Sequence, residues 1–132
     1  MSGYFVLNFS KQFADAVERG EKRQTIRAER KDLRRPHKGQ RLTLYTGMRT
    51  KSCRLLRVVT CTACLPVSIN FRDSTIRVSG APLRGSSLED FAQMDGFESS
   101  AALFDWFRKA HAPKGSRVTL FVGWCCRWEI DR

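Results

Sequence analysis

The segment GEKRQTIR, from Gly20 to Arg27, places a lysine, a threonine and two arginines close together. A lysine with a lowered pKa can accept a proton from a hydroxyl group, and an arginine can hold two oxygens of a phosphate. Neighbouring cations and partial burial are expected to lower the pKa of Lys22. Lys22 then accepts a proton from Thr25 or from a sugar hydroxyl. The alternative is that Lys22 binds phosphate and keeps an ordinary pKa.

Arg27 is expected to share a strand face with Thr25, because residues two apart in an extended segment point to the same side. Its guanidinium then holds either a phosphate or a carboxylate such as that of Asp95. Arg23 is expected to face solvent, where it can contact nucleic acid.

A second group of candidate residues surrounds Gly47. Tyr45, Arg49 and Lys51 bring a phenol, a guanidinium and an ammonium to one turn. Cleavage of RNA by its own 2′-hydroxyl needs a proton acceptor, a proton donor and cations for the developing charge, and no metal. Together with Lys22, these residues are predicted to meet those needs at a cleft. The alternative is that Tyr45 packs by its ring and Lys51 is a surface charge.

The positive charge of the chain is concentrated in one region. The net charge is +11 and the sequence pI is about 10.1, and the segment from Arg19 to Arg57 holds 14 of the 24 lysines and arginines but only three acids. A solubilising surface is one explanation, but such a concentration favours a polyanionic partner. We therefore expect RNA, as single strands or loops, with DNA as an open alternative. The exposed segment Ala28–Gln40 supplies further backbone-binding cations, namely Arg30, Lys31, Arg34, Arg35 and Lys38.

The hydrophobic pattern predicts an α+β chain of 132 residues forming a single domain. Strands are expected at 4–10, 24–27, 41–47, 53–69 and 116–130, and helices at 10–20, 86–96 and 98–111. Pro66 is expected to bend or stop the fourth strand. This order, with helices after the first strand and before the last, favours a small β-barrel with helices at its mouth.

Several classes of protein are disfavoured by the sequence. No apolar run is long enough to span a membrane and no secretory leader is evident, so a cytoplasmic protein without a membrane partner is expected. The five cysteines are expected to be reduced thiols, because the spacing of Cys61 and Cys64 with the adjacent Cys125 and Cys126 does not suit zinc. The two histidines lie in unrelated surroundings. No nucleotide-binding glycine loop is present, and no metal or cofactor is predicted.

Aromatic residues for stacking on bases are missing from the basic segment Ala28–Gln40. Trp106, Trp124 and Trp128 are instead expected to pack in the core, since they occur in a predicted helix and a predicted strand.

The chain resembles the ASCH domains, a family of bacterial and phage proteins among others. The resemblance is carried by the glycine, lysine, threonine and arginine of GEKRQTIR, by Gly39 before a strand and by the corner Asp95-Gly96-Phe97 between two helices. The stretch LYTGMRTKSCR, from Leu44, is similar to one in many bacterial and phage members. The resemblance implies a PUA-like fold with a cleft lined by the GEKRQTIR segment.

The resemblance also implies a choice of functions. Some ASCH domains bind RNA, some are ribonucleases, and one branch hydrolyses acetylated cytidine with a lysine, a threonine and a glutamate. Lys22 and Thr25 match the first two residues, whereas Asp95 stands near the third and is shorter by one methylene. We expect an RNA-binding ASCH domain with weak ribonuclease activity, using Lys22, Thr25, Tyr45 and Lys51. The alternatives are an amidohydrolase of an acylated nucleoside, with Asp95 as the polar partner, and an RNA-binding module without catalysis.

Overall fold

The computed structural model describes residues 3–130, which form three helices and seven strands. The strands are β1 (Phe5–Phe9), β2 (Gln24–Ala28), β3 (Arg41–Thr46), β4 (Arg54–Asn70), β5 (Thr75–Val78), β6 (Ala81–Pro82) and β7 (Leu120–Glu129). The helices are α1 (Lys11–Arg19), α2 (Ser86–Met94) and α3 (Ser100–His111). The α+β class and the positions of the helices, after the first strand and before the last, are as the sequence predicts. None of these helices is long and apolar enough to span a membrane.

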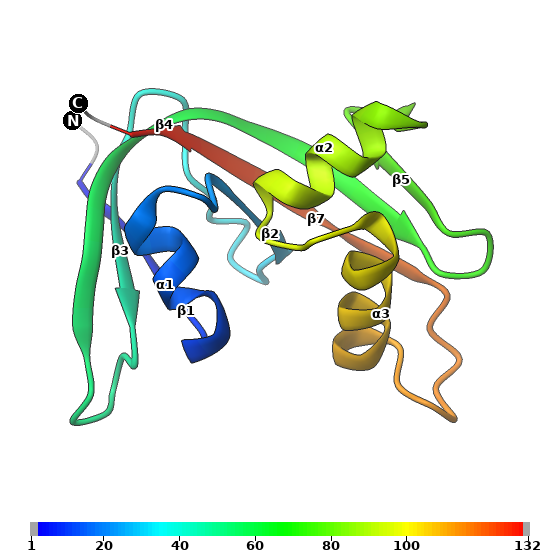
Figure 1. Cartoon of the computed structure of the whole chain (residues 1–132), viewed down its shortest axis with the longest axis horizontal. Coiled ribbons are helices and arrows are strands. Elements are labelled where there is room, and N and C mark those ends of the chain that lie inside the picture. The colour runs from blue at the N-terminus through cyan, green and yellow to red at the C-terminus, as the bar shows by residue number, and fades with distance from the viewer. Residues whose placement is uncertain (1–2, 131–132) are drawn as a thin grey trace.

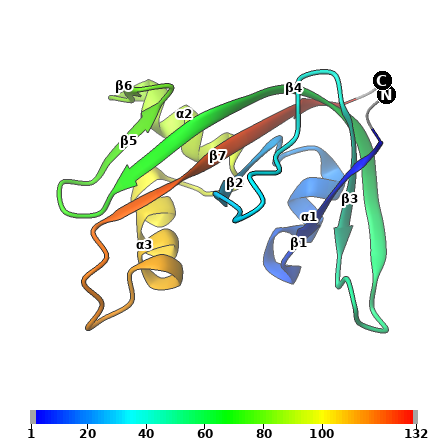
Figure 2. The ribbon, with the colours of Figure 1, turned by 180° about the vertical axis from the view of Figure 1, so that it is seen from behind.

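The strands form one strongly curled sheet, a small PUA-like barrel with an open seam. Strands β1, β3 and β4 are neighbours, β7 pairs with the other edge of β4, and β2 pairs with β7. The curled sheet therefore runs β1-β3-β4-β7-β2, and β1 and β2 are its two ends. The long strands β4 and β7 arch over the molecule, with α1 and α3 beneath the arch (Figure 1). Seen from behind, the loop between β2 and β3 crosses the side of the molecule near β1 (Figure 2).

Local sequence explains where the first elements begin and end. In β1, buried residues alternate with exposed ones, which is the pattern of a strand with one face in the core. Helix α1 ends at Gly20, whose φ of +82° is a left-handed conformation that glycine adopts without strain. Ser10 occupies the N-cap position of α1, but its side chain makes no capping hydrogen bond. The chain then turns and enters β2.

Of the two outcomes predicted for Pro66, a bend or a stop of its strand, the stop is wrong, since β4 continues through Pro66 to Asn70. Strand β3 pairs with β4 only as far as Thr60, and β5 begins to pair at Val67. Pro66 lies on β4 between the part that pairs with β3 and the part that pairs with β5. The missing N–H of proline therefore costs no ladder hydrogen bond on the edge of β4 that faces these two strands. The pairing of β4 is instead irregular at two other places, between Cys61 and Ala63 against β7 and opposite Leu44 and Tyr45 of β3.

The buried residues form two apolar clusters, one on each side of β7. One cluster packs α1 against the sheet formed by β1, β3 and β4, and includes Trp124 and Trp128. The other packs α2 and α3 against β4, β5 and β7. The corner Asp95-Gly96-Phe97 joins α2 to α3, as the sequence predicts, and the two clusters meet near it. This arrangement leaves the GEKRQTIR segment between them, at the open seam.

Candidate functional site

A cleft of about 240 Å³ lies at the open seam of the sheet. Its walls come from the end of β1, the start of α1, strand β2, the Asp95 corner and α3. The lining residues that carry polar side chains are Asn8, Ser10, Lys22, Thr25, Arg27, Asp95 and His111. The remaining lining is mostly aromatic, namely Phe9, Phe13, Phe97, Trp106 and Phe107. A polar floor between aromatic walls is typical of a site for a small planar ligand.

Lys22 lies at the bottom of this cleft and is only 2% exposed. Its ammonium group donates a hydrogen bond to the backbone carbonyl of Asp95 and lies 3.4 Å from the Asp95 carboxylate. It also lies 4.9 Å from the centre of the Phe13 ring. Burial lowers the pKa of Lys22, and the charge of Arg27 lowers it further, whereas Asp95 raises it. The direction predicted from the sequence is confirmed, with burial as the main cause.

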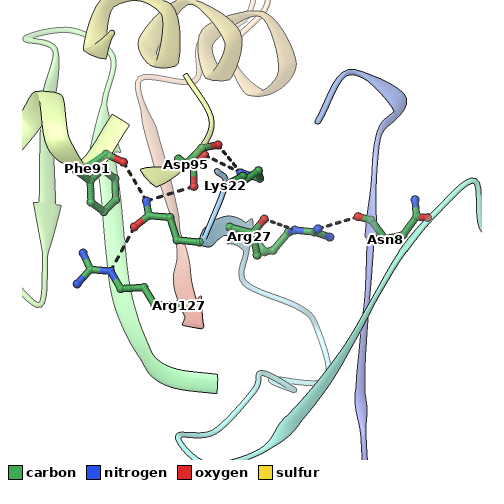
Figure 3. A network of polar contacts seen from close by, with 8 residues as sticks. Asn8, Lys22, Arg27, Phe91, Asp95 and Arg127 are labelled. Carbon is green, nitrogen blue, oxygen red and sulfur yellow. Dashed lines mark hydrogen bonds and ion pairs between the residues drawn. The ribbon is translucent and has the colours of Figure 1, made fainter. Parts of the chain in front are cut away.

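Among the residues that the structure describes, Asp95 is the only carboxylate that lines the cleft, and it is also buried. Burial raises its pKa to about 6, against the opposing effects of Lys22, Gln24 and Arg27. The amide of Gln24 donates to Asp95 Oδ1 at 3.3 Å and also to the carbonyl of Phe91 at 3.3 Å. The Gln24 amide thus helps to hold the carboxylate beside Lys22, and Figure 3 shows Asp95 next to the lysine.

The short side chain of Asp95 reaches Lys22 because the backbone of the corner lies against the lysine. A Cβ placed on Gly96 would come within 3.1 Å of Lys22 Cδ, and Gly96 has a φ of +92°. Glycine is therefore suited to this position both by its backbone conformation and by its small size. The missing methylene of Asp95 is compensated by this close approach.

Thr25 and Arg27 project from the same face of β2, as predicted. Arg27 Nε donates to Thr25 Oγ1 at 2.9 Å, and Arg27 Nη2 donates to the carbonyl of Asn8 at 2.7 Å. The second bond connects β2 to β1 across the seam, where no strand pairing joins them (Figure 3). Arg27 thus positions the Thr25 hydroxyl and holds the edges of the cleft together.

The aromatic wall was missed by the sequence analysis. Phe13 of α1, Phe97 of the corner and Trp106 of α3 contact one another edge to face or tilted, with ring centres 5.4–6.1 Å apart. The prediction that all three tryptophans pack in the core holds for Trp124 and Trp128, and the partly buried Trp106 packs against the second apolar cluster while also lining the cleft. His111 also lines the cleft and stacks on Phe107, and burial lowers its pKa.

The second predicted group does not join the first. Tyr45 is half-buried in β3, and Arg49 and Lys51 are exposed in the turn between β3 and β4. None of these three is among the residues that line the cleft. The turn lies at the far end of the β3–β4 hairpin, beyond α1 from α3 (Figure 1). The expected presentation of a phenol and two cations toward the cleft is therefore not seen in this structure.

The residues predicted to bind nucleic acid are mostly on the surface. Arg23, Arg30, Arg34 and Lys38 are exposed, and Arg35 is partly buried. Within the loop, Arg30 pairs with Asp32 at 3.2 Å and Arg35 pairs with Glu29 at 2.9 Å.

All five cysteines are free thiols in the structure. The sulfur atoms of Cys61 and Cys126 lie 3.6 Å apart inside the barrel. Across residues 3–130, no group of three histidine, cysteine, aspartate or glutamate side chains is arranged to hold a metal ion.

Comparison with known proteins supports the fold alone. The sequence matches no family model, and no curated protein matches it. Among solved structures, the chain is similar to the crystal structure of protein EF3133 from Enterococcus faecalis V583, which belongs to the family DUF984. The match has a TM-score of 0.55 and 16% sequence identity, and it covers 98% of this chain and 80% of that one. This likeness agrees with the PUA-like architecture that the resemblance to ASCH domains implies.

Proposed function

We propose that this protein hydrolyses the amide bond of an acylated nucleoside such as acetylcytidine, with the seam cleft as its active site. The observation that carries the proposal is the convergence of Lys22, Thr25 and Asp95 in one buried cleft. Asp95 contacts Lys22 despite its short side chain, so the substitution of aspartate for glutamate does not weigh against this chemistry.

In the proposed reaction, the Thr25 oxygen attacks the carbonyl carbon of the amide while its proton passes to the amine of Lys22. The C–N bond then breaks, the nucleoside amine takes the proton from Lys22, and the acyl group remains on Thr25 as an ester. Water, activated in turn by Lys22, hydrolyses the ester and restores the threonine. Arg27, which already donates to Thr25 Oγ1, orients this oxygen and favours the loss of its proton.

Lys22 must be an uncharged amine to act as the base. Burial lowers the pKa of Lys22 and raises that of Asp95, so the two shifts run toward each other. They reduce the free-energy difference between the ion pair and the uncharged pair, because a proton moved from Lys22 to Asp95 removes both buried charges. Both shifts favour the neutral amine of Lys22 in comparison with an ordinary lysine.

The aromatic walls suit a nucleobase. Phe13, Phe97 and Trp106 present ring edges and faces that a flat base can contact. His111 at the same wall has a ring that can donate or accept a hydrogen bond.

The earlier ribonuclease prediction has less support from this geometry, because Tyr45 and Lys51 do not line the cleft. RNA binding stays a prediction, and it rests on the exposed cations of the β2–β3 loop.

Release of acetate from acetylcytidine by the purified protein tests the proposal. Replacing Thr25 with valine removes the nucleophile and is expected to abolish release, while Thr25→Ser keeps the hydroxyl and retains part of the activity. Lys22→Met is expected to lower kcat by about 10²–10⁴-fold, the usual contribution of a general base. The exposed Thr119 gives a matched control, and Thr119→Ala should behave as the unmodified protein. A Thr25→Val protein that releases acetate at the normal rate would overturn the proposal.

A further inference from the structure

The cleft continues into a longer groove along the open seam. A second cavity, of about 230 Å³, shares Arg27 and Ala28 with the cleft and is floored by Phe5 and Trp124. A third, of about 280 Å³, shares Phe5 with the second and is bordered by the β2–β3 loop. We call the second and third cavities together the seam groove. It exists because β1 and β2 are the two unpaired ends of the curled sheet.

Arginines follow one another along this groove. Arg27 stands at the junction with the cleft, Arg30 lines the second cavity, and Arg34 and Arg35 line the third. Two of them are paired, Arg30 with Asp32 and Arg35 with Glu29. The backbone N–H of Arg34 donates to Asp32 Oδ1, but its guanidinium forms no salt bridge among the described residues and lies 6.0 Å from the centre of the Phe5 ring. The segment from Arg27 to Arg35 contains five cations and two acids, so the groove has a net positive charge.

Arg27 links the groove to the cleft chemically as well as in space. Its hydrogen bonds to Thr25 and Asn8 use part of its fork of five N–H groups, which leaves donors for an anion at the junction. A phosphate bound there would sit between the base site and the row of arginines. Arginine is well matched to phosphate because its planar fork can contact two oxygens at once.

We propose that the seam groove holds the backbone of a single-stranded polynucleotide whose acylated base occupies the cleft. The substrate is then an acylated base within a strand, and a free nucleoside is only a minimal substrate. This inference rests on the proposed function for the identity of the base in the cleft. Binding of the strand itself rests on the groove and its arginines, which contact phosphates and do not read base edges. A duplex is disfavoured, because its bases are stacked and paired and one of them would have to be flipped out to enter the cleft.

Fluorescence anisotropy with a labelled short oligouridylate, measured over a range of salt concentrations, tests the inference. Each phosphate contact contributes about −0.7 to the slope of log K against log salt for a single strand. Arg34→Gln and Arg30→Gln are each expected to reduce that slope by about 0.7 and to raise Kd about fivefold at 0.1 M salt. Arg34 is exposed and its guanidinium forms no salt bridge among the described residues, so the loss of its side-chain charge should not impair folding. Arg72→Gln is the matched control, because Arg72 is exposed in the turn between β4 and β5 and lines neither the cleft nor the groove.

The results separate this inference from the proposed function. Groove-dependent binding of the oligouridylate without any release of acetate would refute the hydrolase and leave the inference standing. Acetate release from free acetylcytidine with unchanged strand binding in Arg30→Gln and Arg34→Gln would refute the inference alone. Equal loss in Arg72→Gln, equal affinity for duplex, or equal affinity for oligoglutamate would also overturn it. An oligodeoxyuridylate that binds as well as the RNA strand supports recognition through the phosphodiester backbone.

Discussion

Replacing Asp95 with asparagine is expected to stabilise the protein at neutral pH while abolishing its activity. The pKa of Asp95 rises from its ordinary value of 3.8 to about 6 in the folded protein, mainly through burial. The folded chain therefore holds this proton more tightly than the unfolded chain does. The stability conferred by that proton is fully present below pH 3.8 and is lost as the pH rises through 6. Asparagine resembles the protonated side chain and does not ionise, so the variant escapes this loss.

The size of the effect follows from the shift in pKa. A shift of one unit corresponds to about 1.4 kcal/mol, so a shift of about two units corresponds to about 3 kcal/mol at pH 7. At pH 4 the carboxyl group is protonated in the folded chain and about 40% protonated in the unfolded chain, so the difference falls to about 0.5 kcal/mol. Breaking a buried ion pair usually costs about 3–5 kcal/mol, which is an effect of opposite sign. We expect the first effect to dominate because Lys22, left without its partner, can lose its own proton.

Urea unfolding of the unmodified protein and of Asp95→Asn between pH 4 and pH 8 measures this difference. The free energies of unfolding should be nearly equal at pH 4 and diverge in favour of the variant toward pH 7. Asp90→Asn is the control, since Asp90 is exposed on α2 and should show no such divergence. Destabilisation of Asp95→Asn at pH 7 would refute the reasoning, because it would mean that the carboxylate stabilises the fold by holding the charge of Lys22.

Three further changes test other parts of the site. Lys22→Met should raise the pKa of Asp95 above about 6, because the charge of the lysine lowers that pKa. An NMR titration of the carboxyl group measures it, and an unchanged pKa would contradict the expectation. Arg27→Lys cannot keep both hydrogen bonds of the guanidinium, to Thr25 and to Asn8. The free energy of unfolding in urea should fall by about 2 kcal/mol, and a fall below about 0.5 kcal/mol would contradict the role of Arg27 at the seam. Gly123→Ala would place a Cβ 2.0 Å from the carbonyl oxygen of Arg27 and should lower the free energy of unfolding by about 1–3 kcal/mol. An unchanged melting temperature would contradict this, because it would mean that β2 and β7 move apart without cost.

The sequence by itself determined the local features of this protein. Alternating apolar residues marked β1, a glycine in a left-handed conformation ended α1, and the two-residue period placed Thr25 and Arg27 on one face of β2. Each of these depends on neighbours within a few residues along the chain, so pattern and propensity were sufficient. The basic segment was equally visible, because charge needs no fold to be counted.

Only the tertiary structure decided which of these residues meet. Lys22 and Asp95 are 73 residues apart, and their contact depends on how the corner between α2 and α3 packs against β2. The same packing brings Trp106 and His111 to the cleft, while the strand order sends the turn containing Lys51 to the far end of the β3–β4 hairpin. Contacts of this kind depend on burial and on the pairing of distant strands. No local pattern encodes them, since the same sequence period is compatible with many sheet orders.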